Sequence, residues 1–210
     1  EKVKAAETVG AVDASSDSDI MAEIDDREKK LRQLLVEYGK KLVECGLVQG
    51  TWGNLSIRLN DKYMLTTPSG LDYMRLSAAD MVKVEIENLK YEGDKKPTSE
   101  KGLHAAIYKK RPDVGAVIHT HSKYSSVFAA ARKDMPIDKE FYNVFGNEVK
   151  LAEYALPGTK ALMKNTAAAV GNNMGAIMAN HGMIVCGADI EAAFDNCVKL
   201  EENGKRLLYR

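Results

Sequence analysis

Residues 97–122, PTSEKGLHAAIYKKRPDVGAVIHTHS, form the stretch from which the expected fold is worked out. Its first half predicts a helix that ends at Lys110, because the Pro-Thr-Ser of residues 97–99 is a helix start signal and Pro112 disfavours continuation. Its second half predicts a strand, because residues 114–121 begin as an apolar run that ends on two histidines.

His119 and His121 are two positions apart on this expected strand, so their side chains point to the same face. Two neutral imidazoles held in this way suit a divalent metal such as zinc, with Zn–N bonds of ~2 Å. Glu100 opens the preceding helix. A carboxylate there interacts favourably with the helix macrodipole, and this effect alone could explain a glutamate at this position. The same N-terminus offers backbone N–H groups to an anion. The stretch therefore combines metal ligands, a carboxylate and a potential phosphate-binding position.

The other two histidines of the chain are His104 and His181. His181 ends an apolar strand beside a glycine, where it is either a structural residue or a third ligand. Three histidine ligands leave a fourth position open, as in catalytic rather than structural zinc sites. His104 follows Glu100 by four residues on one helix, where packing or support of the site is favoured over ligation.

Composition narrows the class of protein. The chain has 210 residues, with 30 basic and 30 acidic side chains, so no basic field suggests nucleic acid. Three cysteines without a C-x-x-C spacing fit free thiols in a reducing cytoplasm. No apolar run approaches the ~18–20 residues that span a bilayer, and no secretory segment is recognised. A cytoplasmic protein that avoids membranes is expected.

Residues 1–26 are polar and acidic, which predicts a mobile N-terminal extension, and residues 27–210 are expected to form one domain. Residues 26–45 predict an amphipathic helix. Residues 49–54 and 67–70 are glycine-containing polar loops. Such loops can present backbone N–H groups to an anion, although a plain tight turn explains them equally well.

The remaining expected elements do not alternate strictly between strand and helix. This favours a mixed sheet covered by helices over a purely parallel one. Strands are expected at residues 55–59, 63–66, 81–87, 142–145, 149–151, 176–180 and 183–186, and helices at 76–80, 123–132, 159–170 and 190–208.

Six motifs then give the chain a family resemblance. In order they are G-x-W-G-N-L-S, T-P-S-G-L, P-T-S-E, L-H-A-A-I-Y-x-x-R-P-D-V-x-A-V-I-H-T-H-S, Y-A-L-P-G-T and N-H-G-M-I-V-C-G. From about residue 28 to 208 the chain resembles the class II aldolase and L-ribulose-5-phosphate 4-epimerase superfamily. Within it, the similarity is greatest to the L-fuculose-1-phosphate aldolases.

The resemblance implies roles for particular residues. His119, His121 and His181 match the family's zinc ligands, with another divalent metal possible, and Glu100 matches its catalytic acid/base. Six loop residues match positions that hold the substrate phosphate: Thr51, Asn54, Ser69, Gly70, Thr98 and Ser99.

The resemblance also implies the fold and the reaction. The family fold is an α/β/α sandwich around a mixed, largely antiparallel sheet, commonly in a cyclic homotetramer with active sites between neighbouring subunits. The implied activity is that of a zinc-dependent aldehyde-lyase, which interconverts a ketose 1-phosphate with dihydroxyacetone phosphate and an aldehyde through a metal-stabilised enediolate.

Several alternatives stay open within and beyond this family. The epimerases carry an aspartate in place of Glu100 and a lysine in place of Thr67, so both positions favour the aldolases. A methylthioribulose-1-phosphate dehydratase-like lyase would share the metal site. A non-catalytic module, like the adducin heads, would lack the three histidines. The aldolases' C-terminal tail, with its aldehyde-side tyrosine, has no counterpart before Arg210, and Tyr142 is one candidate for the proton-donating tyrosine.

Overall fold

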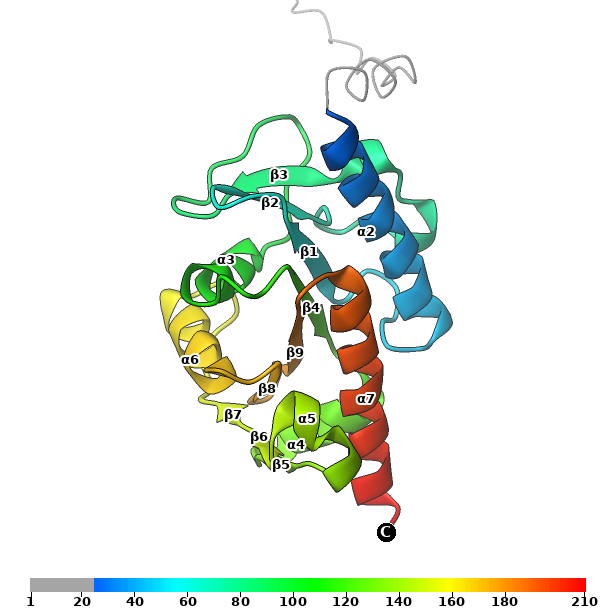
Figure 1. Cartoon of the computed structure of the whole chain (residues 1–210), viewed down its shortest axis with the longest axis vertical. Coiled ribbons are helices and arrows are strands. Elements are labelled where there is room, and N and C mark those ends of the chain that lie inside the picture. Colours follow the sequence, from blue (N-terminus) through cyan, green and yellow to red (C-terminus); the bar gives the residue numbers. More distant parts are fainter. Residues whose placement is uncertain (1–24) are drawn as a thin grey trace, which may run out of the picture.

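Seven strands form one mixed sheet at the centre of the molecule (Figure 1). They are β1 (Asn54–Arg58), β2 (Tyr63–Thr66), β3 (Val82–Glu85), β4 (Ala116–Thr120), β7 (Leu151–Ala152), β8 (Gly175–Met178) and β9 (Gly182–Gly187). Their order is β3-β2-β1-β4-β9-β8-β7, and all neighbours are antiparallel except β7 and β8. The mixed, largely antiparallel sheet predicted from the sequence is confirmed.

The structure is a computed structural model that describes residues 25–210, so the extension expected at residues 1–26 lies almost wholly outside the described residues. The helices are α2 (Asp26–Glu44), α3 (Lys101–Lys110), α4 (Lys123–Ala131), α5 (Tyr142–Phe145), α6 (Lys160–Val170) and α7 (Ile190–Leu208), with 3-10 turns η1 (Tyr73–Arg75), η2 (Ala78–Asp80) and η3 (Lys139–Phe141). β5 (Met135–Pro136) and β6 (Glu148–Val149) pair separately. No helix within residues 25–210 has both the length and the apolar character needed to cross a bilayer.

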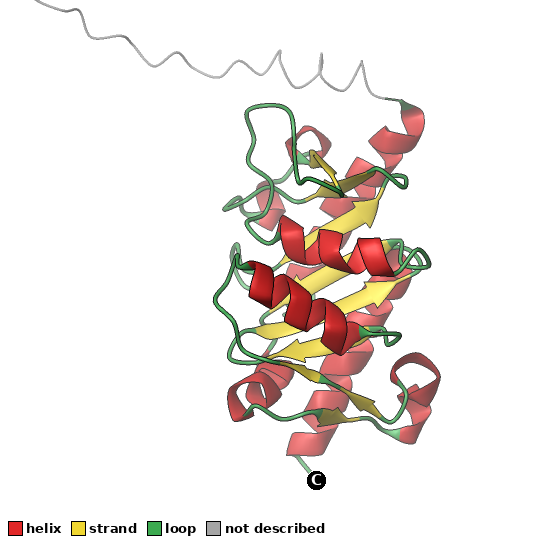
Figure 2. Cartoon of the chain, turned by 90° about the vertical axis from the view of Figure 1, so that its left-hand side faces the viewer, coloured by secondary structure: helices red, strands yellow, loops and turns green. Residues whose placement is uncertain are grey.

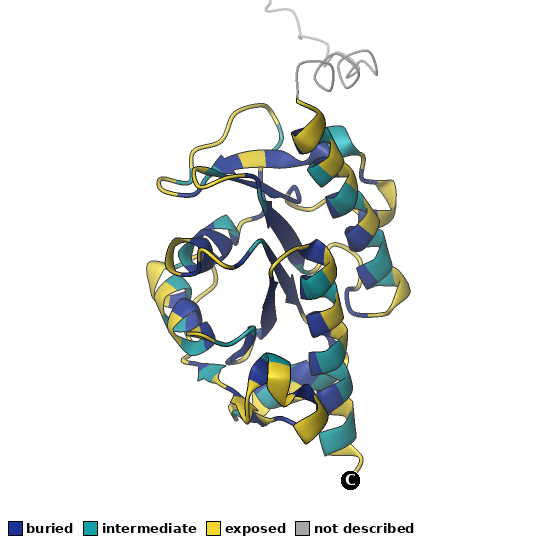
Figure 3. Cartoon of the chain, in the orientation of Figure 1, coloured by how far each residue is buried: buried dark blue, intermediate teal, exposed yellow. Residues whose placement is uncertain are grey.

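Helices cover both faces of the sheet, which makes the fold an α/β/α sandwich. On one face α2, α4 and α7 contribute to the larger of two apolar clusters. On the other face α3 and α6 lie side by side in front of the strands (Figure 2) and contribute to the second cluster. The strands between the layers are almost entirely buried (Figure 3).

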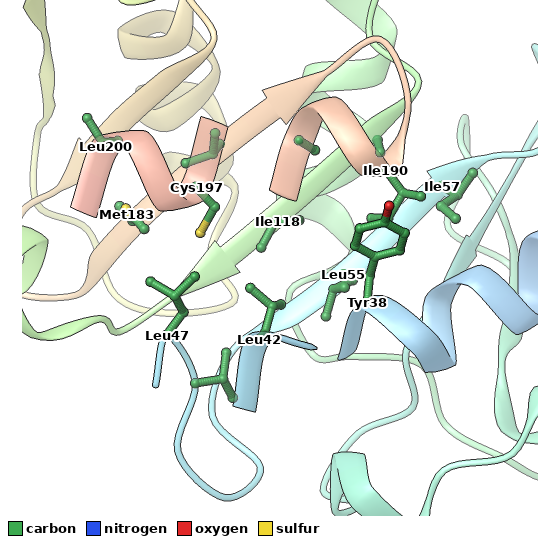
Figure 4. Packing of buried hydrophobic residues seen from close by; sticks show 14 of the residues in the cluster. Tyr38, Leu42, Leu47, Leu55, Ile57, Ile118, Met183, Ile190, Cys197 and Leu200 are labelled. Atoms are coloured by element: carbon green, nitrogen blue, oxygen red, sulfur yellow. The ribbon is translucent and has the colours of Figure 1, made fainter. Parts of the chain in front are cut away.

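The larger cluster packs the central strands against α2 and α7 (Figure 4). Leu42 of α2, Leu55 of β1, Ile118 of β4 and Cys197 of α7 are all fully buried within it. Because side chains alternate along a strand, the neighbours of Leu55 and Ile118 face α3 instead. The sandwich thus gives β1 and β4 one apolar face and one face directed toward α3.

Ile118 is fully buried in β4, so truncating its side chain is expected to destabilise the protein. Ile118→Ala removes three carbons from a close-packed site and should lower the free energy of unfolding by about 2–5 kcal/mol. Urea titration followed by circular dichroism measures this. Val127→Ala on the exposed side of α4 is the control and should stay within about 0.5 kcal/mol. Equal losses in both variants would contradict the assigned packing.

Two expected strands are corrected by the structure. Residues 142–145 form the single helical turn α5, which places Phe141 and Phe145 on one buried face before Gly146 ends it at φ 64°. Their aromatic and β-branched composition favours a strand only when this tertiary contact is ignored. Residues 149–151 do not form one strand either, because β6 pairs with β5 while β7 pairs with β8.

Candidate active site

Three histidines from two distant segments lie around one point. His119 is in β4, His121 follows it directly, and His181 lies in the turn between β8 and β9. Their ring centroids are 4.7 Å, 4.8 Å and 5.1 Å apart. Antiparallel pairing of β4 with β9 is the cause, because it brings the start of β9 beside the end of β4. One nitrogen from each ring falls within 4.8 Å of the others.

The hydrogen bond of His119 to the backbone leaves its other ring nitrogen available to a metal. His119 Nδ1 donates to the Met183 carbonyl at 2.8 Å, so its Nε2 is the acceptor atom and lies 2.9 Å from His121 Nε2. Burial lowers the pKa of His119 to about 3, and burial also lowers the pKa of His121. Neutral imidazoles are the form that binds a metal.

Glu100, at the N-terminus of α3, directs its carboxylate between two of the rings. Its Oε2 lies 3.2 Å from His119 Nε2, and its Oε1 lies 3.3 Å from His181 Nε2. Burial alone would raise the pKa of Glu100, but the imidazoles of His119 and His181 and the Asn54 amide outweigh it and hold the pKa below its usual value. The carboxylate is therefore ionised.

This donor set fits a divalent metal ion. Three nitrogens converge beside an ionised carboxylate, and Glu100 Oε1 is buried without a hydrogen-bond partner among the described residues. A buried charge is costly unless it is paired, and a cation bound by the three nitrogens would pair it. The observation supports a divalent metal in this position.

A chain of polar side chains continues from Glu100 into the layer between β1 and α3. Asn54 Nδ2 donates to Glu100 Oε2 at 2.9 Å, and Asn54 Oδ1 lies 2.5 Å from His104 Nε2. Ser56 Oγ then lies 2.7 Å from His104 Nδ1 and 2.8 Å from the Tyr108 hydroxyl. His104 is thus fully buried outside the three-histidine group, as the sequence favoured.

Sequence reasoning missed Ser56 and Tyr108. Two patterns could have found them. The α3-facing positions of β1, Asn54 and Ser56, are polar on a face that a helix covers, and Tyr108 follows His104 by four residues, one helical turn. Buried polar groups on two facing elements are expected to pair with each other.

The loops expected to hold a phosphate lie beside Glu100. Ser69 N donates to the Lys96 carbonyl at 2.9 Å and Thr98 N to the Thr67 carbonyl at 3.0 Å, so residues 67–70 and 96–99 run together. Ser69, Gly70 and Ser99 are exposed, as is Thr51 in the turn before β1, whereas Thr98 is buried.

Two of these residues serve other groups in the structure. Thr98 Oγ1 accepts from the Glu100 backbone N–H at 3.2 Å. The Asn54 amide donates one N–H to Glu100 Oε2, and its Oδ1 faces His104 Nε2. Tyr142, in α5, is exposed, and no hydrogen bond or ring contact within residues 25–210 joins it to the three histidines.

Helix α4 follows one of the segments that supply the histidines and is hydrogen-bonded to the other. It begins immediately after His121, where Glu201 of α7 accepts hydrogen bonds from the backbone N–H groups of Tyr124 and Ser125 at 2.6 Å and 2.9 Å. At its other end the Ala129 carbonyl accepts from Asn180 N at 2.9 Å. Asn180 directly precedes His181, so both ends of α4 touch the histidine segments.

Comparisons with known proteins agree with this fold. The family described as "Class II Aldolase and Adducin N-terminal domain" matches residues 33–207. The 5-methylthioribulose-1-phosphate/5-deoxyribulose-1-phosphate aldolase of Rhodospirillum rubrum is 38% identical over 175 residues, covering 82% of this chain and 77% of that protein. The L-fuculose phosphate aldolase of Escherichia coli is 34% identical over 165 residues, covering 78% and 76%. A solved L-fuculose 1-phosphate aldolase superposes with a TM-score of 0.82 at 36% identity, covering 86% and 85%.

The chain therefore belongs to the class II aldolase and adducin N-terminal domain family. Its similarity to relatives named as aldolases makes it an enzyme of the aldolase class, for which metal dependence is general. The family resemblance drawn from the six motifs is confirmed.

Proposed function

We propose that this enzyme interconverts a ketose 1-phosphate of the L-fuculose-1-phosphate type with dihydroxyacetone phosphate and an aldehyde, using a bound zinc ion. The observation that carries the proposal is the Glu100 carboxylate, which lies within 3.3 Å of nitrogens of His119 and His181. A general base must lie within hydrogen-bond reach of the proton that it removes, and a cation bound by these histidines would stabilise the negative charge that the removal leaves on the substrate.

In this proposal His119, His121 and His181 hold the ion. When bound, the ion supplies the positive charge that stabilises the negative charge developing on the substrate's carbonyl and hydroxyl oxygens. Glu100 Oε1, the carboxylate oxygen without a hydrogen-bond partner in the described part of the chain, takes the proton from the hydroxyl-bearing carbon of dihydroxyacetone phosphate. In the cleavage direction, Glu100 returns that proton to the same carbon.

We assign the substrate phosphate to the loops beside Glu100. Exposed Thr51, Ser69, Gly70 and Ser99 offer hydroxyl or backbone donors there, and Thr98 and Asn54 hold Glu100 in place. A cytoplasmic homotetramer with active sites between subunits, as in the family, completes the proposal. The domain would comprise residues 27–210, with residues 1–26 as an extension.

The other reactions of the superfamily are less well supported. The epimerases' lysine would replace Thr67, whose buried side chain instead accepts a hydrogen bond from the Leu55 backbone at 3.2 Å. A methylthioribulose-1-phosphate dehydratase-like lyase remains the second candidate, because a relative that is 38% identical is named for methylthioribulose 1-phosphate, although as an aldolase. The intact histidine set argues against an adducin-like module.

The substrate prediction is tested by release of dihydroxyacetone phosphate. We expect L-fuculose 1-phosphate, 5-deoxyribulose 1-phosphate or 5-methylthioribulose 1-phosphate to release it, as measured by coupled reduction with glycerol-3-phosphate dehydrogenase. Chelation should abolish the release, and zinc should restore it. Loss of water without release of dihydroxyacetone phosphate would favour the dehydratase, and no reaction with any ketose 1-phosphate would refute the aldolase proposal.

A further inference from the structure

The hydrogen bonds that link Glu100 to Asn54 and His104 have a definite donor and acceptor at each step. The Asn54 amide nitrogen lies 2.9 Å from Glu100 Oε2 and donates to it, so the amide oxygen faces away from the carboxylate. The other end of the same amide, Oδ1, can then only accept. The ring nitrogen that faces it at 2.5 Å, His104 Nε2, must carry a proton.

The proton on His104 Nε2 determines the direction of the remaining hydrogen bonds. Burial lowers the pKa of His104 to about 4, so the ring is neutral and its Nδ1 is an acceptor. Ser56 Oγ, at 2.7 Å, therefore donates to Nδ1, and the Tyr108 hydroxyl, at 2.8 Å, donates to Ser56 Oγ. Four hydrogen bonds thus run in one direction and end on a single carboxylate oxygen.

We propose that His104 is a positioning residue for the reaction: as the Nε2–H tautomer it holds the Asn54 amide in the one orientation that donates to Glu100 Oε2. The inference rests on the proposed function of Glu100. A reversed amide would direct Oδ1 at the carboxylate, and two acceptors would repel each other. With Oε2 held by Asn54, Oε1 is the oxygen left to exchange a proton with the substrate.

A pair of variants separates this role from simple packing. In glutamine the amide nitrogen is four bonds from Cα, as is Nε2 of histidine, so His104→Gln retains a donor to Asn54. In His104→Asn the amide ends one bond earlier, where it reaches Ser56 but not Asn54. We expect His104→Asn to lower kcat about 10–100-fold, the usual effect of losing a hydrogen bond that orders a charged group.

The other readouts should stay constant in His104→Asn. KM should change less than about threefold and bound metal per chain should stay at the wild-type level, because neither the exposed loops nor the three histidines are altered. His104→Gln should retain kcat within about fivefold. Leu103→Ala, a buried neighbour in α3 outside the polar chain, is the control: its melting temperature should fall while kcat per folded enzyme stays near wild type.

A second measurement does not depend on activity. Nitrogen-15 NMR of histidine-labelled wild-type protein should show His104 as the Nε2–H tautomer. Finding the Nδ1–H tautomer, or wild-type kcat in His104→Asn, would overturn the inference. Losses of kcat that follow melting temperature in all three variants would also overturn it. If the wild type turns over no ketose 1-phosphate, the proposed function fails, and the tautomer decides the inference by itself.

Discussion

Glu100→Gln is expected to lower the turnover number about 10²–10⁴-fold, the usual cost of removing a general base. Glutamine keeps the shape and can still accept the hydrogen bond from Asn54, but its amide cannot take a proton from carbon. Hydrogen–deuterium exchange at the hydroxyl-bearing carbon of dihydroxyacetone phosphate, followed by proton NMR, measures the proton transfer without requiring an aldehyde.

Two comparisons make this result specific. Bound zinc should stay at the wild-type level in Glu100→Gln, because the three histidines are intact. Glu191→Gln, at an exposed position in the first turn of α7, is a matched change of charge and should exchange as fast as wild type. Undiminished exchange in Glu100→Gln would remove this residue from the role of base.

His119→Ala is expected to abolish activity by a different route, through loss of the metal. Removing residues that only support metal ligands commonly weakens metal binding 10–100-fold, so removal of a ligand itself should cost more than about 100-fold. Elemental analysis after dialysis should find zinc at about one per chain in the wild type and far below that in His119→Ala.

Thermal unfolding provides a second readout of the same change. A ligand present at 100 times its dissociation constant stabilises a protein by about 2.7 kcal/mol, so a chelator should lower the melting temperature of the wild type. His119→Ala should show no such response to the chelator. His104→Gln, which alters the one histidine outside the cluster, should bind zinc and respond as the wild type does. Full zinc content in His119→Ala would contradict its assignment as a ligand.

The sequence predicted the parts of the site that depend on local periodicity. Strand alternation placed His119 and His121 on one face, and the helix start signal placed Glu100 at an N-terminus, and the structure has both features. The proximity of His181 depends on the pairing of β4 with β9, a contact between residues that are 63 (Thr120 and Met183) to 71 (Ala116 and Gly187) positions apart. No local pattern shows that pairing, so the residues alone leave His181 as either a structural residue or a third ligand, and the family resemblance implies the ligand role.

The partners of some residues could not be predicted, because they depend on tertiary contacts. The spacing of polar residues could have marked Ser56 and Tyr108 as buried polar groups, but only the packing of α3 over β1 places Ser56 Oγ between His104 and the Tyr108 hydroxyl. Residues 142–145 have strand-forming composition, but burial of Phe145 in the core is achieved by a helical turn. At residues 142–145, strand propensity therefore gives way to packing.

The length of α4 limits where insertions and deletions can occur in sequences related to this one. The helix begins beside His121 and its last turn bonds to Asn180, so its nine residues span the gap between the two parts of the histidine cluster. One residue more or fewer would shift one end by ~1.5 Å, whereas bond lengths at a metal tolerate only ~0.2 Å. Insertions and deletions among functional relatives should therefore fall in the loops beyond this helix and leave its length unchanged.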